Sequence, residues 1–129
     1  MRLLLKLVLA AGLAALPAAA GAQSLIASYV AYIGPEDLRN SRGQRLGEYW
    51  QIIRQDRANY HRFGIRHQQD EWDPYFADAG NRAALEQMVM RGDVDPYSRR
   101  MIVQGNVPVF VELFGQGNRI TSVRVQVPG

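Results

Sequence analysis

The sequence predicts an α+β fold, in which a small antiparallel sheet packs on one face against two or three helices. Residues 107–127 alternate apolar and polar side chains on both sides of a Gly/Asn turn, which is typical of a β-hairpin. Residues 24–33 are rich in Ile, Val and Tyr and so favour a strand. Between these stretches, apolar residues recur at helical spacing behind capping residues.

The chain begins with the pattern of an export signal. Residues 1–22 combine a basic start, an apolar run that ends at Pro17, and small residues at Ala20 and Ala22, which predicts a signal peptide cleaved after Ala22. The apolar run is shorter than the about 20 residues that span a bilayer, and no second such run follows. We therefore expect residues 23–129 to form one small periplasmic or secreted domain without a stable membrane anchor.

Loss of the signal peptide changes the charge balance. Arg2 and Lys6 leave with it, so Lys+Arg falls from 15 to 13, against 12 Asp+Glu. This balance disfavours a nucleic-acid partner. The remaining cations are all arginine, a residue suited to carboxylate and phosphate contacts, but we attribute the bias to general composition. Since cysteine is absent, the hydrophobic core must hold the domain without disulfides.

The predicted elements follow in order along the chain. Residues 24–33 form a third strand, either a central one or an extended segment held by Tyr29 and Tyr32, and a turn begins at Gly34. Residues 48–63 form a helix that ends at Gly64. Its apolar stripe comprises Leu46, Tyr49, Trp50, Ile53, Tyr60 and Phe63. Arg57 interrupts this stripe, and we expect it to extend to solvent or to stack on Tyr60 or Trp50.

Two Asp-Pro pairs mark later helical starts. Asp73 with Pro74 caps a short turn, and Asp95 with Pro96 starts a helix that ends near residue 103. A helix over residues 81–91 lies between them and ends at Gly92. Its predicted inward residues are Ala84, Leu85, Met88 and Val89.

The hairpin register follows from side-chain parity. If the valine faces meet, a three-residue loop over 116–118 pairs Val111 with Val123, Val109 with Val125, and Phe110 with Arg124. Glu112 would then lie diagonal to Arg124. A two-residue loop would require a bulge to keep both valine sets on one face.

Catalytic and metal motifs are not evident. Four carboxylates crowd the loop before the 81–91 helix, namely Asp70, Glu71, Asp73 and Asp78, but their spacing does not match a calcium loop. His61 and His67 are the two histidines, and neither belongs to a zinc or hydrolase motif. We therefore predict no catalytic residue, metal or cofactor, and only as an alternative a small periplasmic hydrolase or metal-dependent enzyme that uses these histidines and acids.

Aromatic residues and arginine in the irregular segment over residues 64–80, the central loop, favour an interaction role. Loops on a rigid scaffold commonly carry binding sites, and exposed aromatics suit partner contacts. A second route would be edge-strand pairing at the hairpin. The candidate binding residues are Arg66, Trp72, Tyr75 and Phe76 in the loop and Phe110 and Phe114 in the hairpin. The sequence thus predicts an exported, non-catalytic module that binds a protein partner or a cell-envelope component.

Overall fold

The computed structural model describes residues 23–129, so the predicted signal peptide lies outside the described residues. The predicted α+β fold is confirmed. The elements in chain order are β1 (Ser24–Ile33), the 3-10 helix η2 (Pro35–Leu38), α2 (Tyr49–Ala58), the π-helical turn η3 (Asn59–Phe63), α3 (Ala79–Arg91), α4 (Pro96–Gln104), β2 (Val107–Gln116) and β3 (Arg119–Gln126). No helix of this part of the chain is long and apolar enough to cross a membrane.

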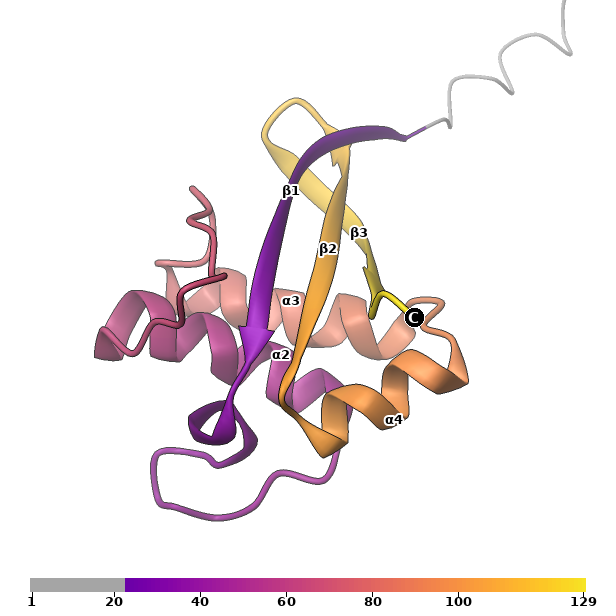
Figure 1. Cartoon of the computed structure of the whole chain (residues 1–129). Coiled ribbons are helices and arrows are strands. Elements are labelled where there is room, and N and C mark those ends of the chain that lie inside the picture. Colours follow the sequence, from indigo (N-terminus) through magenta and orange to yellow (C-terminus); the bar gives the residue numbers. More distant parts are fainter. Residues whose placement is uncertain (1–22) are drawn as a thin grey trace, which may run out of the picture.

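The three strands form one antiparallel sheet in the order β1-β2-β3, so β2 is central and β1 lies at an edge. Helices α2, α3 and α4 lie on one side of the sheet (Figure 1). Alternate residues of β2 are buried against them, and the residues between are half-buried on the other side. The sheet therefore has an inner face that contributes to the core and an outer face without helical cover.

The hairpin register differs from the prediction. A two-residue turn at Gly117 and Asn118 joins the strands, and a bulge between Phe114 and Gly115 restores the parity of the valine faces. Val111 therefore pairs with Val125. The predicted three-residue loop would have paired it with Val123. Glycine is needed at the bulge because a Cβ at Gly115 would collide with the carbonyl group of Arg119.

The shifted register also changes two predicted pairs. Phe110 lies opposite Gln126 and not opposite Arg124. Arg124 instead lies directly across from Glu112, with 3.3 Å between Arg124 Nη1 and Glu112 Oε1. This exposed ion pair contributes at most about 1 kcal/mol to stability.

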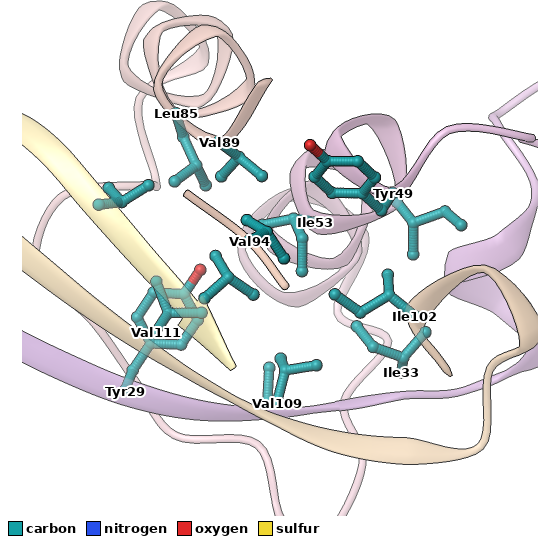
Figure 2. Packing of buried hydrophobic residues seen from close by; sticks show 14 of the residues in the cluster. Tyr29, Ile33, Tyr49, Ile53, Leu85, Val89, Val94, Ile102, Val109 and Val111 are labelled. Atoms are coloured by element: carbon teal, nitrogen blue, oxygen red, sulfur yellow. The ribbon is translucent and has the colours of Figure 1, made fainter. Parts of the chain in front are cut away.

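The core fills the space between the inner sheet face and the three helices (Figure 2). Strand side chains such as Tyr29, Val109 and Val111 point toward Ile53 of α2 and Val89 of α3 (Figure 2). All five are almost completely buried. Burial of such side chains contributes about 1.5–3 kcal/mol each, which suits a fold that has no disulfide.

The helix ends follow the predicted caps. Asp95 accepts a hydrogen bond from the Ser98 amide over 2.8 Å at the start of α4, and Gly64 ends the η3 turn with a φ of 68°. Asp73 caps a turn, since its Oδ1 accepts from the amides of Tyr75 and Phe76. No helix follows this turn directly. The start of α3 differs from the prediction, because the helix begins at Ala79 and Asp78 caps it by accepting from the Asn81 amide over 2.9 Å.

Two predicted inward residues are exposed. Phe63, at the end of the π-helical turn, is 44% exposed, because the wider repeat of this turn moves it off the α-helical stripe, whereas Tyr60 in the same turn stays buried. Ala84 is also exposed, while Arg82 takes an inward place on α3. The buried stripe of α2 instead contains Ile52, which the spacing did not include.

Candidate functional site

A fully buried arginine organises the central loop. Arg57 of α2 lies between two tyrosine rings, with its guanidinium carbon 4.2 Å from the Tyr29 centroid and 4.6 Å from the Tyr60 centroid. The predicted stacking on Tyr60 is thus present, whereas the alternative in which the side chain reaches solvent is wrong. Arg57 Nε donates to Asp56 over 2.9 Å, and Nη1 donates to Asp73 over the same distance.

Asp73 connects this arginine to the loop backbone. Its Oδ2 accepts from Arg57 and contacts His61 Nε2 at 2.7 Å, while its Oδ1 accepts the Tyr75 and Phe76 amides at 2.8 and 2.6 Å. Burial would raise the pKa of Asp73, but its hydrogen bonds with His61, the Phe76 amide and Arg57 hold that pKa below its ordinary value. The carboxylate is therefore a charged fixing point for the second half of the loop.

The first half of the loop is bound to the free edge of β1. Glu71 accepts the Val30 amide through Oε1 at 2.7 Å and donates its own amide to the Val30 carbonyl at 2.8 Å. Asp70 accepts the Tyr32 amide through Oδ1 at 2.7 Å. These two acids occupy the edge amides that an unprotected strand would offer to another chain.

His67 fastens the same segment to η2. Its Nε2 lies 2.9 Å from Glu36 Oε1, and its Nδ1 lies 3.3 Å from Asp70 and 3.9 Å from Asp37. The imidazole also packs on the Tyr32 ring, with 5.6 Å between centroids. A Cβ at Gly34 would collide with this imidazole, so glycine there permits the close approach.

The charges around His67 affect its protonation. Burial alone would lower the pKa of His67, but the hydrogen bond with Glu36 and the charges of Asp37 and Asp70 outweigh it and raise the pKa above its ordinary value. Burial raises the pKa of Asp37, although Asn59 and the Gly34 amide donate hydrogen bonds to it. The raised pKa therefore favours the imidazolium form of His67 among these three carboxyl groups.

The fixed loop separates its aromatic residues into different environments. Trp72, next to Glu71, is 65% exposed, and Tyr75 is half-buried. Arg66 is exposed and stacks on Tyr60, with its guanidinium carbon 4.2 Å from the ring centroid. Phe76 is 1% exposed and packs edge-on against Tyr29. Its assignment as a surface binding residue is therefore wrong, because the Asp73 turn directs it into the core.

Phe110 and Phe114 lie on the outer sheet face and are half-buried. Phe110 is opposite Val30 of β1, and Phe114 is opposite Leu25, which is 54% exposed. Their predicted role in edge-strand pairing is wrong, because β2 is central and both of its edges already pair with strands. The side chains of these two phenylalanines form part of the outer face of the sheet.

The residues of the predicted alternative enzyme are not brought to one site. His61 contacts Asp73, whereas His67 contacts Glu36 and Asp70 in a separate network. Asp78 is engaged as the α3 cap. Within residues 23–129, no group of three or more His, Asp or Glu side chains is placed to hold a metal ion.

Sequence reasoning missed the polar residues that fix the loop. Asp56 and Asn59 were assigned to no site, and Asp37 was assigned only to a turn, yet all three are buried and hydrogen-bonded. One signal was available, since Arg57 directly follows Asp56 and interrupts the apolar stripe of its helix. The contacts of Asn59 with Asp37 and of Arg57 with Asp73 could not be identified by spacing, because they join distant parts of the chain.

Comparisons of this chain with protein-family models, with curated proteins and with solved structures gave no match.

Proposed function

We propose that the chain is a small exported, non-catalytic protein that binds a protein partner through an outer aromatic surface. This surface consists of Trp72 in the loop together with Val30, Tyr32, Phe110 and Phe114 on the outer sheet face. The observation that carries the proposal is the exposure of Trp72, at 65%, on a loop that buried charges hold in place.

The position of Trp72 beside the sheet supports one continuous surface. Trp72 follows Glu71, which pairs with Val30, and Val30 lies opposite Phe110 in the sheet. Tyr32, which packs on His67, continues the same row of outer residues along β1. Single exposed apolar residues are common on soluble proteins, but a gathering of several on one rigid face is typical of an interaction site.

The chemistry of the surface suits a protein partner. Tryptophan, tyrosine and arginine are enriched among residues that dominate binding energy, and the loop that carries Trp72 also carries the exposed Arg66. The Glu112–Arg124 pair on the outer face adds polar atoms for hydrogen bonds at the margin. Hydrogen bonds already hold the loop that carries Trp72 in place, so it loses little conformational entropy on binding, which favours affinity.

A hydrolase that uses His61, His67 and the acids of residues 70–78 is the weaker alternative. Asp70, Glu71 and Asp73 are already engaged by backbone amides. The proposed binding role requires none of these groups to leave its structural partner.

Affinity capture from envelope extract tests the proposal. Trp72→Ala and Phe110→Thr should both lose the same captured protein, while Tyr97→Ala should retain it, because Tyr97 is a 41% exposed aromatic on α4 outside the surface. Circular dichroism of each variant checks that it is folded. Retention of every captured protein by the folded Trp72 and Phe110 variants would contradict the proposal.

A further inference from the structure

A groove of about 340 Å³ lies between α2 and α3, on the side that faces away from the sheet. Its charged lining consists of Arg54 and Arg62 from the α2–η3 segment and Arg82 and Glu86 from α3. Phe63 contributes an apolar wall and is 44% exposed. The groove is separate from the outer aromatic surface, which lies across the sheet.

Arg82 is the most constrained of these arginines. It is only 6% exposed, and its Nη1 donates to the carbonyl groups of Phe76 and Ala77 at 2.9 and 3.0 Å. Its Nε and Nη2 donate to no acceptor within residues 23–129, and no carboxylate of that range forms an ion pair with it. These two nitrogens share one edge of the guanidinium, the edge that a carboxylate or phosphate binds through two parallel hydrogen bonds.

The other charges of the groove leave Arg82 without compensation. Glu86 pairs with Arg54, with 2.9 Å between Glu86 Oε1 and Arg54 Nη1. Arg62 packs on Phe63, with its guanidinium carbon 5.1 Å from the ring centroid, and has no ion-pair partner among the described residues. Burial, and then the nearby charges of Arg54 and Arg62, lower the pKa of Arg82, while Asp78 opposes this effect.

Such an arrangement favours the entry of an anion. Like charges repel, and a guanidinium that is mostly removed from water loses hydration that hydrogen bonds must replace. Surface arginines can turn toward solvent, but the bonds to Phe76 and Ala77 hold Arg82 in place. The Nε and Nη2 atoms of Arg82 are not among the fully buried atoms, so a ligand can reach them, and a bound oxyanion would supply two acceptors and a negative charge.

We propose that the α2–α3 groove binds the phosphate or carboxylate group of a small organic molecule. Arg82 binds the anionic oxygens through Nε and Nη2, and Arg62 adds a second cation from the facing segment. Phe63 packs against the apolar part of the molecule. The volume of about 340 Å³ suits a metabolite-sized ligand rather than a polymer.

Titration of the mature protein with inorganic phosphate and, separately, with acetate tests this site. The readout is the Nε–Hε resonance of Arg82 in NMR spectra at constant ionic strength. A saturable shift with either anion is expected, and Arg62→Gln should weaken the binding at least about tenfold. Arg91→Gln is the matched control, because it removes an exposed arginine from the last turn of α3 outside the groove and should leave binding unchanged.

Three outcomes would overturn the proposal. The first is a shift that does not saturate or that chloride reproduces at equal ionic strength. The second is equal binding by the Arg62 and Arg91 variants. The third is sedimentation with anionic phospholipid vesicles without binding of free phosphate or acetate, which would assign the basic residues to a membrane surface. Arg62 is exposed, so its substitution tests the site without disturbing the buried contacts of Arg82.

Discussion

Arg57 and Asp73 form a buried ion pair across 2.9 Å that joins α2 to the central loop. Both side chains are almost completely shielded from water. Because Asp73 also holds the amides of Tyr75 and Phe76, this pair determines where the loop runs and which of its aromatic residues face solvent. The loop is thus positioned by charge as well as by the hydrophobic core.

Asp73→Ala should lower the free energy of unfolding by about 3–5 kcal/mol, because it leaves a buried guanidinium with one carboxylate fewer and frees two amides. Urea unfolding measures the change. Arg54→Ala is the control, since it breaks the more exposed pair with Glu86 and should cost no more than about 1 kcal/mol. Equal losses in the two variants would contradict the role given to the Arg57–Asp73 pair.

Trp72→Ala and Phe76→Ala should have opposite consequences for stability. Phe76 is 1% exposed, so its truncation should cost about 3–5 kcal/mol through lost burial and a cavity. Trp72 is 65% exposed, and its truncation should change the free energy of unfolding by no more than about 0.5 kcal/mol. Thermal and urea denaturation of both variants measure the difference, and a large loss for Trp72→Ala would show that its ring is structural.

The protonation of His67 should make stability depend on pH. The pKa of His67 is raised on folding, so its contribution is complete below the unfolded-state pKa of about 6.5 and is lost as the pH rises through the folded-state pKa. The stability difference between wild type and His67→Gln should therefore be larger near pH 6 than near pH 9. Urea unfolding at the two pH values measures this difference, and a constant difference would contradict the account.

NMR titration of the His67 ring isolates the contribution of Glu36. The hydrogen bond over 2.9 Å favours the imidazolium, so Glu36→Gln should lower the titration midpoint. Glu112→Gln, the same change on the outer sheet face, should leave the midpoint in place. An unchanged midpoint in Glu36→Gln would mean that the charges of Asp37 and Asp70 alone raise the pKa of His67.

Glu71→Ala should expose the edge of β1 to solvent. Its carboxylate accepts the Val30 amide at 2.7 Å, so hydrogen exchange at Val30 should accelerate about tenfold or more when that acceptor is lost. Exchange at Val111 should not change, because this residue lies in the central strand. Uniform acceleration at both amides would indicate global destabilisation instead of local opening.

The sequence was sufficient for the elements whose signals are local. Alternating valines, Asp caps and glycine stops located the strands and helices within a few residues. The register of β2 and β3 could not be predicted from local signals, because the bulge at Gly115 depends on contact with the backbone of Arg119 in the opposite strand. The exposure of Phe63 was missed for a similar reason, since a π-helical turn leaves no clear mark in apolar spacing.

The candidate site was predictable only in part. Trp72 could be chosen as a candidate binding residue from its place in a polar loop, and its exposure agrees with that choice. The inward direction of Phe76 and the fixing of the loop by Asp70, Glu71 and Asp73 could not. Those features depend on partners in β1 and α2 that are distant in the sequence.

The most direct test of the proposed role is photo-crosslinking of the protein in its native cells. Benzoyl-phenylalanine at position 72 and at position 110 should give an adduct with the same protein, because both positions belong to one surface beside β1. The same label at position 97, on α4, should not give that adduct. Failure of positions 72 and 110 to give a shared adduct, or an identical adduct from position 97, would contradict the account.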